Sequence, residues 1–291
     1  GRMGYIGKVS IYGDVVRALS STLGATQRIN FPDVVDNRID RTIYQLGPVE
    51  VGGDVAIPMI VEGSSGSGSS SAFLKSIWKK AFDRDANTGE LLQQGTVALI
   101  YSYQQARSFH NCKINTLTIR ATAQDRVEAT MNFMGTTAVD SDESSGASLP
   151  GDAARVMTWD AVQVNGNKFA SCIVREVNLS LANNLSRNYT FCDLVSTTGA
   201  PHNLFASNIS TGKRQVNGTI GFQGWAPTDE LAEQNPHTVG TNGTLTLTFG
   251  DWTAPISKCA FEYQTINLAT GLVTSTVNWY SIGDLGAVTP D

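Results

Sequence analysis

Two neighbouring segments of the chain alternate between apolar and polar side chains, and this alternation limits the folds open to it. Cys112–Ala123 (CKINTLTIRATA) and Arg126–Gly135 (RVEATMNFMG) both show the period of two that is typical of half-exposed β-strands. Because only a short turn at Ala123–Asp125 joins them, we expect the two segments to pair as an antiparallel hairpin. The sequence therefore predicts a mainly β protein.

Similar patterns occur on both sides of this hairpin. Val49–Val61 contains two glycines and Pro58, so we expect this strand to bulge or to lie at a sheet edge. The other predicted strands lie within Gly7–Ala18, Leu19–Phe31, Gly95–Gln105, Arg175–Asn184, Arg214–Trp225, Thr244–Phe249, Cys259–Leu268 and Leu272–Gly283.

Two segments show helical features instead. In Ala72–Arg84 (AFLKSIWKKAFDR) the apolar side chains recur at helical spacing, and the lysines fall outside the apolar side. Pro227–Gln234 (PTDELAEQ) begins with proline and has acidic residues in its first turn, which favours a short helix. The apolar side of the first helix comprises Phe73, Ile77, Trp78, Ala81 and Phe82.

The order of these elements recurs along the chain. Ala138–Asp152 is acidic and contains glycine and proline, which indicates a linker. After it, Val216–Ile220 stands where Val51–Val55 stands before it. We therefore expect two tandem β-sandwich or half-barrel modules, residues 1–137 and 154–291, joined by residues 138–153 and each carrying one flanking α-helix.

The segment Val34–Asp54 (VVDNRIDRTIYQLGPVEVGGD) is predicted to form an extended polar arm, a turn at Gly47-Pro48, and then a strand interrupted by Gly52-Gly53. The arm has mixed charges on both faces, so it resembles either a contact with another protein surface or a solvated loop. The candidate contact residues, between rings or between subunits of an assembly, are Asp36, Arg38, Asp40, Arg41 and Tyr44.

Composition excludes several functions. The net charge of −5 argues against binding phosphate backbones as the main task, and the chain has no run of apolar residues long enough for a membrane helix. The amino end also lacks the apolar core of a signal peptide. The four cysteines, Cys112, Cys172, Cys192 and Cys259, are isolated, which disfavours a zinc site and a dense disulfide framework.

No motif for catalysis is present. The three histidines have no nucleophile motif nearby, so we expect no enzyme activity, no cofactor and no metal. The predicted strands are instead rich in hydroxyl groups; Thr244, Thr246 and Thr248, for example, share one face. Such a face is either an ordinary solvent-facing sheet or a wall of small polar groups that lines a passage.

The chain resembles the bacteriophage tail tube (major tail) proteins. The resemblance lies in PDVVDNRIDRTIYQLGPVEVGGDVAIP at Pro32–Pro58, in REVNLSLANNLSRNY followed by KRQVNGTIGFQGW, and in the terminal hairpins of both halves. It implies a β-sandwich with a flanking helix that assembles through continuous sheets into rings, which stack into a tube that conducts DNA during ejection.

The resemblance also implies partners and a location. The chain would bind copies of itself, and two modules per chain would make a homotrimer that imitates a sixfold ring. Tape measure and terminator proteins would be further partners, and DNA would pass without specific binding. Assembly is expected in the host bacterial cytoplasm, and the product is expected in the virion tail.

A second class of protein stays open from the sequence. A carbohydrate- or receptor-binding β-sandwich adhesin of a virion would place aromatic side chains in exposed loops. The candidates are Trp159, Trp225 and Trp252, for which packing in the core is the alternative.

Overall fold

The computed structural model describes residues 8–32, 43–61, 70–82, 92–102, 105–141, 155–165, 174–190, 204–223, 245–250, 252–254, 256, 259–262, 265–270 and 272–282. Within these ranges the protein is mainly β, as predicted, with one α-helix, α1 (Ser70–Phe82), and a 3-10 turn at Trp159–Ala161.

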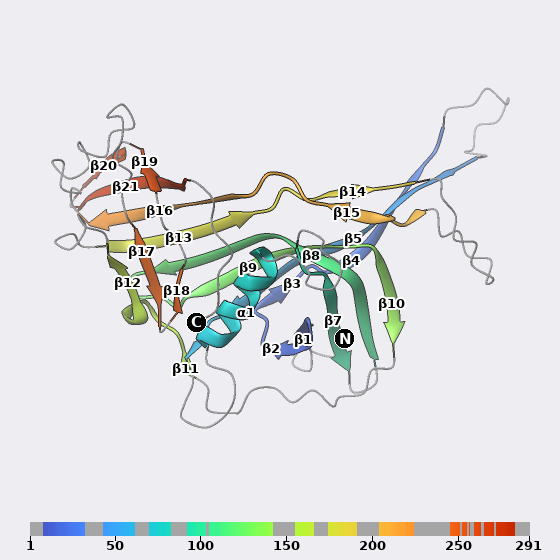
Figure 1. Cartoon of the computed structure of the whole chain (residues 1–291), viewed down its shortest axis with the longest axis horizontal. Helices are drawn as coiled ribbons and strands as arrows, with labels where there is room; N and C mark the ends of the chain where they lie inside the picture. Colours follow the sequence, from blue (N-terminus) through green and yellow to red (C-terminus); the bar gives the residue numbers. More distant parts are fainter. Residues whose placement is uncertain are drawn as a thin grey trace.

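One long antiparallel sheet runs through the molecule (Figure 1). Its strands lie in the order β4-β5-β9-β8-β13-β16-β21, with β19 and β20 both paired to β21. Because β8 pairs with β13, strands from before residue 138 and after residue 153 form one sheet. The bounds are β4 (Gly24–Asn30), β5 (Gln45–Pro58), β8 (Gln105–Thr122), β9 (Glu128–Gly135), β13 (Val174–Ala182), β16 (Gln215–Gln223), β19 (Cys259–Phe261), β20 (Thr265–Ala269) and β21 (Leu272–Ser281).

Shorter strands form the remaining layers. The first half of β8 leaves the long sheet and pairs with β7 and β10, and β7 in turn pairs with β1, which pairs with β2. A separate three-stranded sheet has the order β12-β17-β18, β6 pairs with β11, and β3 pairs with β5. The bounds are β1 (Lys8–Ile11), β2 (Asp14–Val16), β3 (Ser20–Ser21), β6 (Ile60–Val61), β7 (Gly95–Ser102), β10 (Thr137–Ser141), β11 (Arg155–Val156), β12 (Val162–Asn165), β17 (Thr246–Phe249) and β18 (Trp252–Thr253).

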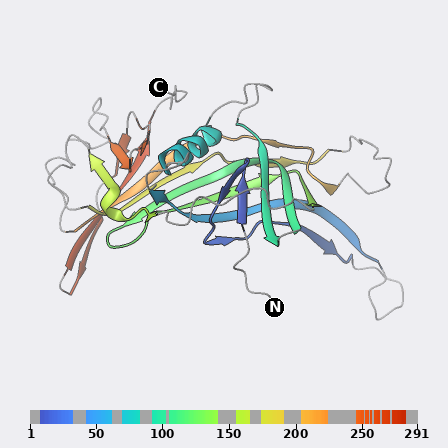
Figure 2. The same ribbon diagram turned by 90° about the horizontal axis from the view of Figure 1, so that it is seen from below.

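The core lies on one face of the long sheet, where α1 and the shorter strands cover it (Figure 2). Alternate residues of the long strands point into this core, which follows from the period of two. The helix is held by aromatic contacts, because the Trp78 ring lies 4.8 Å from that of Phe82 and 5.4 Å from that of Trp252. One continuous core therefore contains residues from both parts of the chain.

The predicted hairpin of β8 and β9 and the predicted helix are confirmed, although β8 begins at Gln105 rather than at Cys112. The helix begins at Ser70 rather than Ala72, and four residues of its expected apolar side are buried. The side chain of Phe73 lies outside the described part of the chain, as does the second expected helix at Pro227–Gln234.

The predicted turn at Gly47-Pro48 is wrong. The strand β5 runs without a break from Gln45 to Pro58, because pairing with β4 keeps its backbone extended. The Gly-Pro pair instead lies at a β-bulge, where three steps along β5 match two along β4. This bulge lies at the start of the predicted Val49–Val61 strand and not at its glycines or Pro58, and β5 is not an edge strand because it pairs with β4 on one side and β9 on the other.

The expected linker also starts later than its composition suggests. Residues 138–141 belong to β10, which pairs with the first half of β8. Arg107 on β8 donates a 2.8 Å hydrogen bond from Nε to Asp140, so the acidic character of this stretch serves a cross-strand ion pair. Residues 142–153 lie outside the described ranges.

Candidate assembly surface

The distal parts of β4 and β5 and the residues that adjoin them, 27–32 and 43–49 together, form a two-stranded hairpin stem that extends beyond the layered body (Figure 1). We call it the first arm. Ile29 lies directly opposite Leu46, and the alternation continues outward to Phe31 and Tyr44. All four side chains are exposed, and Tyr44 reaches 67% exposure. An apolar stripe on a projecting two-stranded ribbon is typical of a surface that meets another protein.

The candidate contact residues from the sequence fall largely beyond this stem. Asp36, Arg38, Asp40 and Arg41 lie outside the described residues, and Tyr44 belongs to the apolar stripe. The other stripe residues were not among the candidates predicted from the sequence. Ile29 and Phe31 are two positions apart, as are Tyr44 and Leu46, so alternation on both sides of the polar segment could have identified them.

A second, shorter hairpin is bound to the stem of the first. Its strands are β14 (Ser186–Asn188) and β15 (Asn208–Ser210), and we call it the second arm. Arg187 donates a 2.7 Å hydrogen bond from Nη2 to the carbonyl oxygen of Val51, and the Tyr189 hydroxyl donates one of 3.3 Å to that of Val49. Burial raises the pKa of Tyr189. These contacts fix the second arm along β5.

A buried lysine adds to this attachment. Lys113 on β8 donates a 3.0 Å hydrogen bond from Nζ to the carbonyl oxygen of Ile209 on β15. Its side chain is buried, which is rare for lysine and requires polar partners. The base of the second arm is therefore anchored by a charge-assisted hydrogen bond.

The long sheet ends in two edges that lack a neighbouring strand among the described residues. At one edge, β3 and β4 pair with β5 alone, and at the other, β19 and β20 pair with β21 alone. Leu268 on β20 is 78% exposed. Edge strands present backbone hydrogen-bonding groups to which a further strand can add.

The face of the long sheet opposite the core is polar. The Oγ atoms of Thr118 and Ser180 lie 3.4 Å apart across β8 and β13, and Asn132 donates a 2.8 Å hydrogen bond to Asp54. Similar small polar side chains continue over β13, β16 and β21; they include Asn178, Asn217, Thr219, Thr274, Thr276 and Asn278. We call this the polar face.

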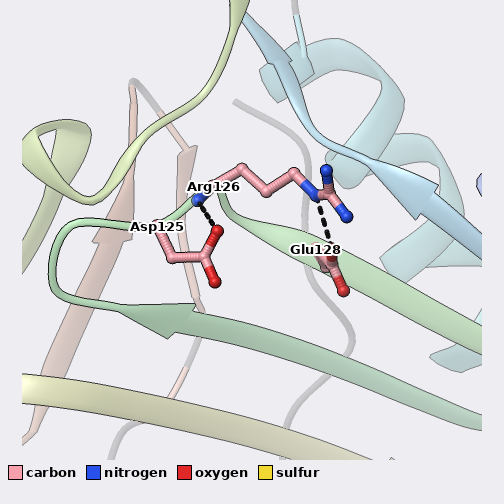
Figure 3. A network of polar contacts seen from close by, with 3 residues as sticks. All are labelled: Asp125, Arg126 and Glu128. Carbon is pink, nitrogen blue, oxygen red and sulfur yellow. Dashed lines mark hydrogen bonds and ion pairs between the residues drawn. The ribbon is translucent and has the colours of Figure 1, made fainter.

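Two arginines near one end of the polar face are each paired with a glutamate. Arg120 contacts Glu176, with Nε and Nη2 at 3.0 Å and 2.9 Å from Oε1. Figure 3 shows the other pair, in which the Nε of Arg126 lies 2.5 Å from Oε1 of Glu128. The same figure shows the Arg126 backbone N–H donating to the Asp125 carboxylate.

The two described cysteines are structural. Cys112 and Cys259 are buried, and burial raises the pKa of each thiol to about 12. A thiol with so high a pKa stays protonated at neutral pH and is a poor nucleophile. Cys172 and Cys192 lie outside the described residues.

The described residues hold no group of three or more His, Cys, Asp or Glu side chains that could bind a metal ion. In the same part of the chain, no helix is long and apolar enough to cross a membrane. Of the tryptophans considered for an adhesin, Trp159 is 49% exposed, Trp252 is buried in the core, and Trp225 is outside the described ranges. Because Trp252 is buried, the three tryptophans do not form an exposed aromatic group.

The comparisons with known proteins identify the family of the chain. The family model described as phage tail tube protein matches residues 5–223 of the 291. No curated protein matches the chain. Because the match covers well over half of the sequence, the chain belongs to the phage tail tube family, whose members are structural proteins of the tail.

Proposed function

We propose that this chain polymerises into stacked rings that form the tail tube and conduct DNA during ejection. The observation that carries the proposal is the pair of open edges on one long sheet, β3–β4 at one side and β19–β20 at the other. Both edges present backbone N–H and C=O groups, so one edge of a copy can pair with the opposite edge of the next copy in a head-to-tail manner. Head-to-tail contacts close into rings when the rotation between copies permits it.

The order of pairing supports two modules within each chain. In the first part, β4 pairs with β5, β5 with β9, and β9 with β8. In the second, β13 pairs with β16, β16 with β21, and β21 with β19 and β20. The second series repeats the first in the same antiparallel sense.

The registers agree with this repetition. Gly53 lies opposite Phe133 in the first series, and Gly218 lies opposite Trp279 in the second, with both aromatic rings fully buried. On the next strand outward, Ile114 lies opposite Phe133 in the first series, and Phe261 lies opposite Trp279 in the second. Ile114 therefore corresponds to Phe261. The buried thiols, Cys112 and Cys259, then occupy corresponding positions.

We propose that the strands at the junction between chains pair in the same way as β8 and β13 do within the chain. Within the chain, Ala121 lies opposite Val177. When the two series are aligned, Ala121 in the first corresponds to Leu268 on β20 in the second. In the same alignment, Val177 in the second corresponds to Ser21 on β3 in the first. We therefore propose that Leu268 of one copy lies opposite Ser21 of the next, which covers the exposed leucine.

Two modules per chain make a homotrimer with the appearance of a sixfold ring. In this arrangement the polar face lines the passage, since the opposite face is covered by α1 and the shorter strands. The first arm, together with the charged segment Asp36–Arg41 that lies between its two strands in the sequence, carries contacts between rings or neighbours. Tape measure and terminator proteins are the further partners proposed, with assembly in the host cytoplasm.

Electron microscopy of the purified protein tests the proposal. We expect rings and tubes with three chains per ring and a rotation of about 60° between neighbouring modules, both within and between chains. Six chains per ring would refute the trimer, and lone particles under all conditions would refute the tube.

Cysteine cross-linking tests the junction. The double variant Ser21→Cys/Leu268→Cys is expected to form disulfide-linked trimers under oxidation, because opposed strand positions bring the two Cβ atoms within reach of a disulfide. The matched control, Ser21→Cys/Asn208→Cys, places the second thiol on the second arm and is expected to stay unlinked. Equal linking of both variants would contradict the register.

A further inference from the structure

The paired arginines of the polar face form one alternating group of charges. Arg120 lies opposite Glu128 across β8 and β9, while its guanidinium reaches Glu176 on β13. Arg126 binds Glu128 from the turn between β8 and β9. Two cations and two anions therefore alternate over three neighbouring strands.

Both arginine side chains remain open to solvent in spite of these contacts. Their exposed fractions are 62% for Arg120 and 49% for Arg126. An exposed arginine without a carboxylate partner is a strong binder of phosphate, because its planar guanidinium matches phosphate geometry. Because the group occurs in every chain of every ring, even weak attraction of this kind would act many times along one duplex.

We propose that Glu128 and Glu176 neutralise Arg120 and Arg126 so that DNA phosphates meet neither arginine as an unpaired cation. Arg120 links β8 to β13, Arg126 binds Glu128 two residues along the same segment, and the glutamates cancel the arginine charges in place. The ligand class concerned is a polyanionic duplex. This inference rests on the proposed function, since it assigns the polar face to the passage.

Two variants of these four residues separate the effect of an unpaired arginine from that of the other substitutions. Glu128→Gln/Glu176→Gln removes two negative charges, so the net charge of −5 becomes −3 and both arginines lose their partners. Adding Arg120→Gln and Arg126→Gln to these changes restores −5, because two positive charges are removed as well. Only the double variant therefore presents unpaired guanidinium groups.

Binding of a short fluorescent DNA duplex to the full-length protein measures the effect, by anisotropy over a series of salt concentrations. We expect the double variant to bind at least about tenfold more tightly than the wild type, with a steeper loss of affinity as salt rises. The quadruple variant is expected to match the wild type. Equal binding by the double variant and the wild type, or by the double and quadruple variants, would overturn the inference.

Two further measurements keep the result interpretable. Thermal unfolding reports whether each variant folds, and the single variant Glu176→Gln, expected to show a smaller increase in binding, replaces the double variant if that one does not fold. Microscopy of the same samples reports on tubes. Absence of tubes in the wild type counts against the proposed function, whereas tubes with unchanged DNA binding in the charge variants count against this inference alone.

Discussion

Gly218 lies directly opposite Trp279 in the pairing of β16 and β21, and the absence of a side chain at Gly218 leaves the space that the indole ring occupies. A Cβ atom at this position would come within 2.7 Å of the ring and would also collide with the carbonyl oxygen of Asn178 on β13. The glycine thus allows the largest side chain of this strand pair to lie flat in the core.

Replacement of Gly218 by alanine is expected to destabilise the fold by about 1–3 kcal/mol, because a backbone oxygen and a packed ring must both move. Chemical denaturation measures the loss. Gly24→Ala is the matched control, since its Cβ would meet only one atom, at 3.9 Å. Equal stability of the two variants would contradict the steric argument.

The carboxyl end of α1 is bound by residues from the second part of the chain. Arg214 donates a 2.7 Å hydrogen bond to the carbonyl oxygen of Phe82, and buried Asn183 donates to those of Ala81 and Ile114. Asn183→Leu leaves these two acceptors without that donor, so we expect a loss of about 2 kcal/mol in the free energy of unfolding.

Denaturation of this variant should be compared with that of Asn208→Leu, which removes an exposed amide hydrogen bond from the second arm. The control is expected to change stability by less than about 0.5 kcal/mol. A similar loss in both variants would show that burial of Asn183 is not the cause.

The apolar stripe of the first arm is expected to act in assembly rather than in folding. Ile29→Ser/Leu46→Ser should abolish tubes in electron micrographs, because it removes the pair of exposed apolar side chains that a neighbour would cover. The melting temperature of the unassembled chain should stay nearly unchanged. Asn30→Ser/Gln45→Ser, the adjacent opposed pair, should still form tubes.

Deletion of the charged segment tests separately whether its residues make contacts between subunits or rings. A chain lacking Asp36–Tyr44 is expected to fold and yet fail to polymerise. Normal tubes from this deletion would remove the segment from the assembly surface.

Stability should fall at high pH because of the two buried thiols. The unfolded chain releases each thiol proton near pH 8.5, whereas folded Cys112 and Cys259 keep theirs until about pH 12. Between these values the folded state binds more protons, so the free energy of unfolding decreases as pH rises. Denaturation at several pH values should show a shallower decrease for Cys112→Ala/Cys259→Ala, and parallel curves would contradict the assignment.

Local patterns in the sequence were sufficient for the elements themselves. The alternation around Leu117 and Met131 predicted the β8–β9 hairpin, and the spacing of Ile77, Trp78 and Ala81 predicted the buried side of α1. Both patterns are local, since each depends on which side chains an isolated strand or helix presents to one face. The relation of Val216–Ile220 to Val51–Val55 likewise places Gly218 with Gly53.

Such local patterns did not predict the contacts between distant parts of the chain. The Gly47-Pro48 pair reads as a turn, yet the ladder with β4 holds it in an extended strand. Arg187 and Val51 are 136 positions apart, and nothing near either residue indicates their hydrogen bond. The partner of a side chain across a sheet is set by strand order and register, which short segments do not encode.

The sequence by itself thus determined a mainly β chain with one clear amphipathic helix, a low charge and no catalytic motif. Tertiary structure alone decided that β8 pairs with β13, that one core spans both parts, and that each arginine of the polar face lies against a glutamate. The physical reason is that backbone alternation fixes which face a residue occupies, whereas the neighbour on that face is chosen by the packing of the whole chain.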